Sequence, residues 1–256
     1  MNMINPTKEI IKLQANQLKM QSFKRYEDVI RQLETGESYE HFLSKLMKTE
    51  IDIRQENQQK RKLKAAKFPF YKSIDEFDYT RLEHVSNACI TELAACDFVK
   101  KRQNIVMIGN PGSGKTHLSI GLGLKACSAG FNVKFYTAAN LANELTEALQ
   151  INRLSKFERT LSKVDLLIID ELSYLTFNRH QSELLFQVIS ERSERSSIIV
   201  NTNLEFSNWT QLFENEIMVT ALIDRLTFKS HILDMNVEDS YRLLQTKLVG
   251  KKNDVK

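Results

Sequence analysis

The stretch GNPGSGKT, residues 109–116, decides the fold of this 256-residue chain. It fits the pattern G-x-x-x-x-G-K-[ST], in which glycines let backbone N–H groups wrap the phosphates of a nucleotide. The apolar run 105–108 comes directly before it, and a helical pattern at 115–129 follows it. Because a strand before this loop and a helix after it are the context that confirms the motif, we predict a P-loop that binds ATP.

Side chains at the end of the loop have separate roles in the predicted site. Lys115 reaches the β- and γ-phosphate oxygens, and the hydroxyl of Thr116 ligates Mg²⁺. His117 adjoins the bound nucleotide and is expected to pack rather than to hold a metal. The residues assigned to nucleotide binding are therefore Gly109, Asn110, Pro111, Gly112, Ser113, Gly114, Lys115, Thr116 and His117.

A second signal is the apolar run 166–169, which ends in Asp170 and Glu171. Asp170 is placed to hold the hydration shell of Mg²⁺, and Glu171 is placed to orient and polarise the attacking water. Two solvated loop acids are the alternative for an isolated Asp-Glu pair. The P-loop upstream favours the catalytic interpretation.

Two asparagines follow the apolar run 198–200. A polar amide at the end of a buried strand suits sensing of the γ-phosphate or alignment of water, and Asn203 is the first choice, with Asn201 second. The alternative is an asparagine that caps a helix or forms a turn.

Further along, Arg225 lies on a helical pattern at 219–228. It is a candidate arginine finger supplied to the ATP of a neighbouring subunit. The alternative for Arg225 is a surface ion pair with Asp224 or Glu216.

The fold class follows from alternating patterns. Helical patterns at 80–99, 138–150, 155–163, 181–195 and 239–248 are interspersed with strands that include 133–137, 197–202 and 231–235. Strands that alternate with helices predict an α/β domain with a mainly parallel sheet covered on both faces.

The first quarter of the chain has a different character. Residues 5–67 read as helices, with a turn at 36–38 and Ser38 as a candidate cap of the second helix. Residues 54–62 contain no apolar residue, which indicates an exposed helix or a connector. Pro69 disfavours helix in the residue before it, so we place a boundary between a helical domain at 1–67 and an ATPase domain at 68–256.

Positive charge is concentrated in the helical domain. Residues 1–67 contain 14 Lys and Arg against 9 Asp and Glu, a net charge of +5, whereas residues 68–256 have a net charge of −1. A basic appendage on a near-neutral body indicates a polyanionic partner, with a solvated helix face as the alternative.

Several classes of protein are disfavoured. The chain has no apolar run of 18 residues, so we expect no membrane span, and without an export signal we expect a cytoplasmic protein. The three cysteines are odd in number and form no C-x-x-C pair, which argues against a disulfide framework and a zinc ribbon.

The ordered motifs resemble the IstB family, the AAA+ helper ATPases of a class of bacterial insertion sequences, which are related to the helicase loader DnaC. The resemblance lies in residues 109–141, in DLLIIDELSYL (165–175), in NTNLEFSNW (201–209), and in LIDRLTFKSHIL (222–233) with DSYRLL (239–244). Residues 56–79 resemble the family's link between a helical domain and the ATPase core. The resemblance spans roughly residues 10–245 and is far more specific than the P-loop alone.

The resemblance implies an AAA+ core with a five-stranded parallel sheet in the order 5-1-4-3-2 and a short or missing C-terminal lid. It implies ATP-driven assembly on duplex DNA, recruitment of a transposase, and a homo-oligomer with ATP sites at subunit interfaces. It assigns the sensor role to Asn203 and the finger to Arg225, and it places Phe77 and Tyr79 near the nucleotide. Arg242 is its weak candidate for a second sensor.

Two other functions share the motifs. A DnaC-like loader of a replicative helicase would use the same ATPase residues. A metabolic P-loop kinase would need an acceptor pocket and a mobile lid, and it leaves residues 1–67 without a role.

Overall fold

The computed structural model describes residues 6–34, 36–173, 176–193, 195–213 and 215–237. Contacts divide the chain into two compact units, residues 1–61 and 62–256. The division falls inside helix α3 (Tyr39–Ala66), a few residues before the predicted boundary after Lys67. It falls there because Leu63 and Ala66, in the last turn of α3, pack on the core of the second unit.

The described part of the helical unit consists of short helical elements that pack on one another, followed by the first part of α3. The shorter elements are α1 (Pro6–Gln17), η1 (Ser22–Arg25) and α2 (Tyr26–Ile30). Ser38 accepts a hydrogen bond at Oγ from the backbone N–H of His41 at 3.2 Å, which confirms the predicted cap. The helix continues without interruption through residues 54–62, so this stretch is an exposed helix rather than a connector.

A buried carboxylate holds the helical unit together. Glu50 on α3 accepts hydrogen bonds from the backbone N–H and the hydroxyl of Ser22 and from Nε of Arg54, each at 2.8 Å. Burial pushes the pKa of Glu50 upward, but these hydrogen bonds outweigh it and leave the pKa below its ordinary value. The ionised form of Glu50 therefore stabilises the junction between η1 and α3.

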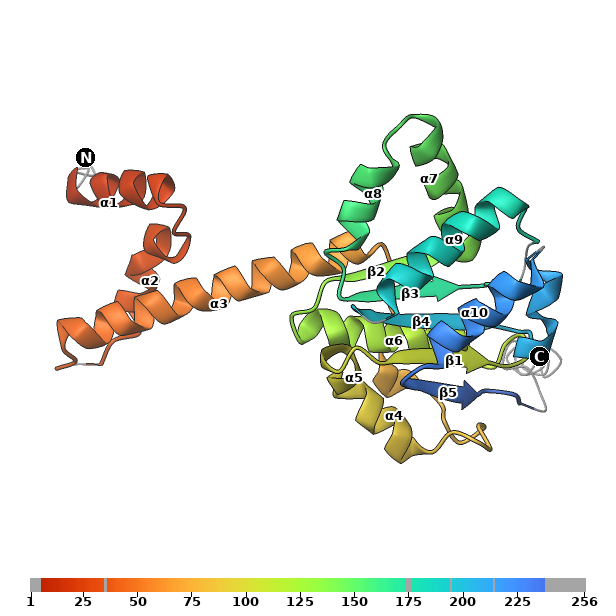
Figure 1. Ribbon diagram of the computed structural model, residues 1–256. Helices are drawn as coiled ribbons and strands as arrows, with labels where there is room; N and C mark the ends of the chain where they lie inside the picture. The colour runs from red at the N-terminus through yellow and green to blue at the C-terminus, as the bar shows by residue number, and fades with distance from the viewer. Residues whose placement is uncertain (1–5, 35, 174–175, 194, 214, 238–256) are drawn as a thin grey trace, which may run out of the picture. The chain divides into compact units, whose positions relative to one another are not determined.

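The second unit is built on one parallel sheet in the order β2-β3-β4-β1-β5 (Figure 1). This is the predicted order 5-1-4-3-2 read from the opposite edge, so the predicted AAA+ topology is confirmed. Every neighbouring pair is parallel. The strands are β1 (Asn104–Ile108), β2 (Val133–Thr137), β3 (Leu166–Asp170), β4 (Ser197–Thr202) and β5 (Ser230–Asp234).

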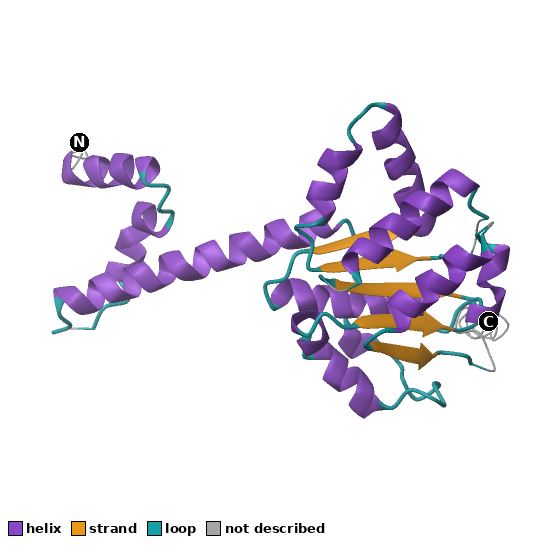
Figure 2. Cartoon of the chain, in the orientation of Figure 1, coloured by secondary structure: helices purple, strands orange, loops and turns teal. Residues whose placement is uncertain are grey.

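Helices cover both faces of the sheet, and Figure 2 shows the strands between the two helical layers. Alternate strand residues face opposite layers, as the pleat requires. Ile105 and Met107 of β1 join the apolar core that contains α6, whereas Val106 and Ile108 join the core that contains α7, α9 and α10. The helical elements between β1 and β5 have the following bounds: α6 (Lys115–Ser128), α7 (Ala138–Gln150), α8 (Leu154–Leu161), α9 (Arg179–Arg192), η3 (Phe206–Gln211) and α10 (Glu216–Thr227).

The prediction of a single helix at 80–99 is wrong. The structure has two short helices, α4 (Asn87–Ala94) and α5 (Asp97–Lys100). Helix α4 begins late because the Ser86 hydroxyl caps it by accepting from the N–H of Cys89 at 3.2 Å. It ends early because Cys96 adopts a left-handed conformation with φ of 62°, which no helix continues through.

The segment between α3 and β1 packs closely along α6. A Cβ atom at Gly123 would lie 2.8 Å from the ring of Phe68, and one at Gly121 would lie 3.0 Å from Cβ of Ile74. Ile74 begins the short helix η2 (Ile74–Glu76). These two glycines therefore create the space in which the segment lies against the helix.

Three predictions concern residues that are not described. The helix expected at 239–248, the candidate Arg242 and the short lid all fall outside the described ranges. Within those ranges, no helix is both long and apolar enough to cross a membrane.

Candidate functional site

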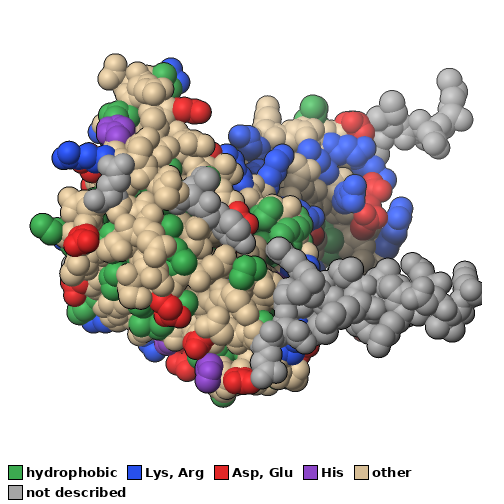
Figure 3. Space-filling view, turned by 90° about the vertical axis from the view of Figure 1, so that its right-hand side faces the viewer, with side chains coloured by type: hydrophobic (Ala, Val, Ile, Leu, Met, Phe, Trp, Pro, Cys, Tyr) green, Lys and Arg blue, Asp and Glu red, His purple; other side chains and the backbone are tan. Residues whose placement is uncertain are grey.

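The predicted site residues other than Arg225 gather at the carboxyl ends of the strands. The arrowheads in Figure 1 point to this edge, and Figure 3 looks onto it. Parallel strands end at the same edge, so the P-loop after β1, Asp170 at the end of β3 and Asn201 in β4 come together there. This is the edge at which open α/β sheets bind their ligands.

The P-loop depends on two glycines with positive φ, Gly112 at 81° and Gly114 at 95°. Gly114 is also crowded, because a Cβ atom there would lie 2.8 Å from the ring of Phe77. Both constraints exclude larger residues from the turn that leads into α6. The loop therefore presents backbone N–H groups at the N-terminus of a 14-residue helix, an arrangement that binds phosphate.

Lys115 lies within the loop and is 8% exposed. Its ammonium group donates to the carbonyl oxygens of Gly109 at 2.5 Å and Asn110 at 2.9 Å. These bonds hold the charge of Lys115 next to the backbone that would surround the phosphates. The cation is thus placed to reach the β- and γ-phosphate oxygens.

Thr116 and Asp170 are in direct contact. The Thr116 hydroxyl lies 2.9 Å from Oδ2 and 3.2 Å from Oδ1 of Asp170, which is 4% exposed. A hydroxyl and one carboxylate beside a phosphate-binding loop match the way proteins bind Mg²⁺, with one or two carboxylates and substrate phosphates. No cluster of three His, Cys, Asp or Glu ligands occurs among the described residues, so a dedicated protein cage for a metal is not present there.

Glu171 differs from Asp170 in both exposure and backbone. It is exposed, and its φ of 59° is positive, which is unusual for a residue other than glycine. Strained backbone of this kind persists where surrounding structure enforces it, often at functional sites. Glu171 lines the same cavity as Thr116 and Asp170.

The cavity has a volume of about 660 Å³, within the range of small-molecule sites. The predicted residues that line it are Phe77, Pro111, Gly112, Ser113, Gly114, Lys115, Thr116, His117, Asp170, Glu171, Asn201 and Asn203. Tyr79 does not line it. Sequence reasoning missed part of the wall, which comes from the segment before α4: Phe70, Lys72, Glu76, Asp78, Arg81 and Leu82.

Most of these residues lie in the stretch 56–79 that resembles the family's link, but nothing in that stretch indicated that they line the cavity, because irregular segments show no periodicity. Phe77 and His117 link this segment to the P-loop helix. Their rings meet edge to face at 5.3 Å, and Nε2 of His117 lies 2.8 Å from the carbonyl oxygen of Ser73. His117 therefore packs against the segment, in the manner expected from the sequence.

Gly109 and Asn110 contact the chain after β5. The Asn110 side chain donates to the carbonyl of Val237 at 2.6 Å, and its backbone N–H donates to Oδ1 of Asn236 at 3.0 Å. A Cβ atom at Gly109 would lie 2.6 Å from the backbone of Met235. The start of the P-loop is thus fixed to residues 235–237, a contact that no motif indicated.

The structure places Arg225 away from this cavity. Its guanidinium lies over the ring of Phe186 at 5.2 Å and donates through Nη1 to the carbonyl of Ala221 at 3.0 Å. No ion pair joins Arg225 to Asp224 or Glu216. Within one subunit, Arg225 therefore does not join the residues around the P-loop.

Proteins similar in sequence align with most of this chain. It is 38% identical over 215 residues to a protein named as the ATP-binding protein of insertion sequence IS5376 from Geobacillus stearothermophilus, covering 84% of this chain and 85% of that relative. It is 36% identical over 213 residues to the corresponding protein of insertion sequence IS21 from Pseudomonas aeruginosa, covering 83% and 80%.

Solved structures share the fold at low identity. DnaA from Aquifex aeolicus with bound AMPPCP gives a TM-score of 0.54 at 18% identity, covering 74% of this chain and 58% of that one. DnaI gives 0.51 at 17% identity, covering 65% and 90%. The chain spans a little over half of the DnaA structure, and the likeness shows an AAA+ P-loop fold.

A sequence model described as IstB-like ATP binding protein matches residues 13–249, which include the P-loop, the Asp-Glu pair and the asparagine strand. With that match over nearly its whole length, and with relatives from insertion sequences that are 36% and 38% identical over most of the chain, the chain belongs to the family of IstB-like ATP-binding proteins.

Proposed function

We propose that this protein is a Mg²⁺-dependent ATPase that assembles on duplex DNA and recruits or stimulates the transposase of its insertion sequence. The observation that carries the proposal is the convergence of Lys115, Thr116, Asp170 and Glu171 on one cavity in a chain of an insertion-sequence family. The geometry supports the hydrolytic part, and the family supports the DNA and transposase part.

The chemistry assigned to the cavity is hydrolysis of ATP to ADP and phosphate. Lys115 and the N-terminus of α6 bind the phosphates and stabilise the charge that develops on them. Glu171 accepts a hydrogen bond from water and orients it toward the γ-phosphorus, while the bond to the β,γ-bridging oxygen breaks. Mg²⁺, held by Thr116 and Asp170, would offset charge on the phosphate oxygens.

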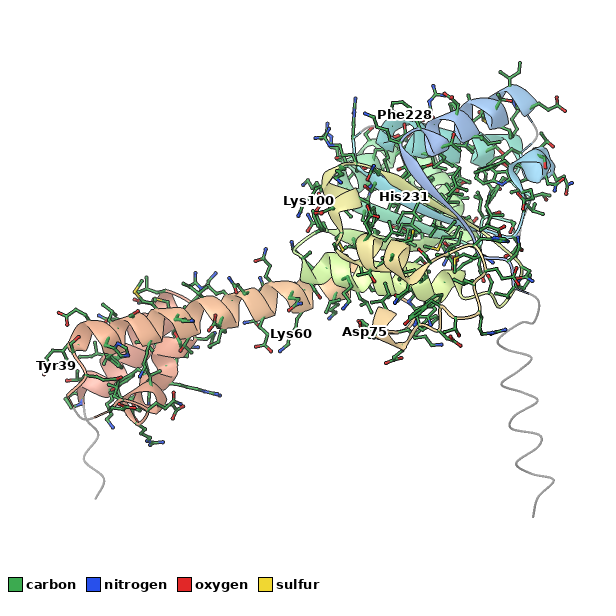
Figure 4. All side chains as sticks on the ribbon, turned by 90° about the horizontal axis from the view of Figure 1, so that it is seen from below. Tyr39, Lys60, Asp75, Lys100, Phe228 and His231 are labelled. Carbon is green, nitrogen blue, oxygen red and sulfur yellow. The ribbon has the colours of Figure 1, made fainter. Side chains whose placement is uncertain are left out.

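The DNA-binding part rests on exposed cations along α3. Lys60 points outward in Figure 4, where it is labelled, and 67% of its side chain is exposed. Arg61 and Lys64 on the same helix are also exposed. Cations that neutralise DNA phosphates release counterions, so the proposed binding weakens steeply as salt concentration rises.

Oligomer formation is part of the same proposal. Arg225 is anchored to Phe186 and lies away from its own ATP cavity, which supports a role as a finger for a neighbouring subunit. Asn203 lines the cavity and remains the proposed γ-phosphate sensor. Each complete site would then contain residues from two subunits.

The first experiment is sedimentation of the protein with duplex DNA, with and without ATP. We expect large protein–DNA particles only with ATP, abolished by Lys115→Ala and trapped by Glu171→Gln. The matched control is Lys163→Ala. Lys163 is exposed and comes just before β3, at the end of the strand opposite to Asp170. Normal ATP-dependent assembly of both site variants would refute the assignment.

The second candidate, a DnaC-like helicase loader, shares the fold seen in DnaI. The same experiment separates the two functions. If the protein ignores duplex DNA in both nucleotide states but binds a hexameric replicative helicase, the loader function replaces the transposition function.

A further inference from the structure

Asp170 belongs to a closed ring of hydrogen bonds that joins three elements. Asn201 on β4 donates through Nδ2 to Oδ1 of Asp170 at 2.9 Å, and the Thr116 hydroxyl lies 2.9 Å from Oδ2. The same Nδ2 lies 2.9 Å from Oγ of Ser119 on α6, which in turn donates to the carbonyl of Thr116 at 3.1 Å. Both oxygens of the carboxylate therefore have partners, Oδ1 in Asn201 and Oδ2 in Thr116.

The ring lies in the interior of the unit. Asn201 is 1% exposed and Ser119 is fully buried, so the bond between these two side chains is shielded from solvent, whereas the Thr116 hydroxyl at the cavity is partly exposed. Low polarity strengthens hydrogen bonds inside a protein and raises the cost of leaving one unmade. The ring is thus a rigid support beneath the carboxylate, and none of its bonds involves the cavity wall formed by residues 70–82.

The orientation of the Asn201 amide follows from its partners. The Ser119 hydroxyl has one hydrogen, which is committed to the Thr116 carbonyl, so toward Asn201 it can only accept. Ionised Asp170 can also only accept. The NH₂ group must therefore face both, and the amide oxygen Oδ1 is left without a partner among the described residues. A buried oxygen without a hydrogen bond has a free-energy cost. We take this cost as an indication that the NH₂ group of Asn201 has a function.

We propose that Asn201 and Ser119 are positioning residues for the metal-binding carboxylate. By fixing Oδ1 of Asp170, while Thr116 contacts Oδ2, they set the direction in which the carboxylate faces the Mg²⁺ that accompanies ATP. The inference rests on the Mg²⁺–ATP site of the proposed function. It assigns Asn201 a role that differs from that of Asn203, and it gives Ser119 a role that no motif indicated.

The two asparagines differ in what they contact. Both line the cavity, but Asn203 is partly exposed, and its backbone N–H donates to Oγ of Ser173 at 2.9 Å. Asn201 is buried against Asp170. Asn203 is therefore placed to meet the nucleotide, whereas Asn201 acts through Asp170.

The decisive variant is Asn201→Asp, which keeps the size of the side chain and replaces the donating NH₂ by an oxygen. A second carboxylate would then face Asp170 in a buried site, and like charges at this distance repel. Partners that orient metal ligands typically change metal affinity by about 10- to 100-fold when altered. Ser119→Ala keeps the amide but removes one of its acceptors, so we expect a smaller shift in the same direction.

The test is binding of a fluorescent ATP analogue to the full chain, titrated with Mg²⁺ and repeated in EDTA. We expect the Mg²⁺ midpoint of Asn201→Asp to rise by about 10- to 100-fold, with nucleotide affinity in EDTA close to wild type. Asn203→Asp is the matched control, and it should weaken nucleotide binding without a shift of this size in the Mg²⁺ midpoint. Thermal unfolding of each apo variant checks the fold, and Ser119→Ala carries the test if Asn201→Asp does not fold.

Each result has a distinct meaning. An unchanged Mg²⁺ midpoint in Asn201→Asp and Ser119→Ala, or equal losses with Mg²⁺ and EDTA, would overturn the positioning role while leaving the ATP site intact. If the wild-type protein itself shows no Mg²⁺-dependent nucleotide binding, the proposed ATPase function fails first.

Discussion

The two units of this protein bury apolar side chains to very different extents. In the ATPase unit, strand residues such as Met107 and Leu167 are fully buried between helical layers. In the helical unit, the described apolar residues that are buried are Ala15, Val29 and Leu46. The exposed large apolar residues there are more numerous: Ile10, Leu13, Leu18, Ile30, Tyr39, Leu43, Met47 and Ile51.

This difference indicates two sources of stability. Apolar burial is the dominant favourable contribution to folding, and the ATPase unit has it on both faces of the sheet. The helical unit relies to a greater degree on the bonds that Glu50 makes with Ser22 and Arg54. Tyr39, labelled in Figure 4, is 92% exposed and contributes little to this unit's packing.

The largest expected effect comes from a matched pair of methionines. Met107→Ala removes a fully buried side chain from β1 and should destabilise the ATPase unit by about 2–5 kcal/mol. Met47→Ala changes a side chain that is 51% exposed on α3 and should alter stability by no more than about 0.5 kcal/mol. Chemical unfolding followed by the fluorescence of Trp209, the single tryptophan, reports on the ATPase unit.

The pair tests the contrast directly. Equal losses for Met107→Ala and Met47→Ala, measured by fluorescence and by circular dichroism, would show that the two units do not differ in the way their burial indicates.

A smaller effect is expected in the helical unit from Glu50→Gln. The amide removes the charge that strengthens three hydrogen bonds, and bonds to charged groups contribute about 1.5–3 kcal/mol. The helical signal in circular dichroism should unfold at lower denaturant concentration, while the Trp209 transition stays in place. Glu56→Gln, which alters an exposed pair with Lys60, is the control and should change little. A shift in the Trp209 transition alone would contradict the assignment of Glu50 to the helical unit.

The smallest expected effect is a dependence on pH. The pKa of folded Glu50 is below its ordinary value of 4.5, so the folded unit binds fewer protons than the unfolded chain in mild acid. The stabilisation is complete above the unfolded pKa and is lost as the pH falls through the folded pKa. Between neutral pH and acid, the helical unit of the wild type should therefore lose more stability than that of Glu50→Gln. If the stability of the wild type and that of Glu50→Gln fell by the same amount as the pH is lowered, Glu50 would not be the source of this pH dependence.

The sequence predicted the parts of the ATPase unit in which local pattern and fold agree. Particular residue types are required in the glycine loop at 109–116, in the buried strands at 105–108 and 166–169, and at the acids that follow the second strand. For this reason the sequence motifs and the structure agree at Lys115, Thr116 and Asp170. Their convergence on one edge follows from parallel strands, which the alternating pattern indicates.

Other features depend on tertiary contacts and could not be predicted. The break at Cys96 requires a left-handed residue that is not glycine, and no local preference announces it. The cavity wall at 70–82 is irregular, so periodicity carries no information about it. The ring through Ser119 and Asn201 joins residues 82 positions apart, and a serine within a helix has no signal that distinguishes it.

The close packing along α6 has a mechanical consequence. The glycines at 121 and 123 bring the segment after Ala66 into steric contact with the helix that begins at the P-loop. Helix α6 therefore cannot slide along its axis without pushing this segment, and the segment continues directly into the end of α3. The helix that begins at the phosphate-binding loop and residues 68–74 are thus fitted to one another within the ATPase unit, and a side chain added at either glycine would push them apart.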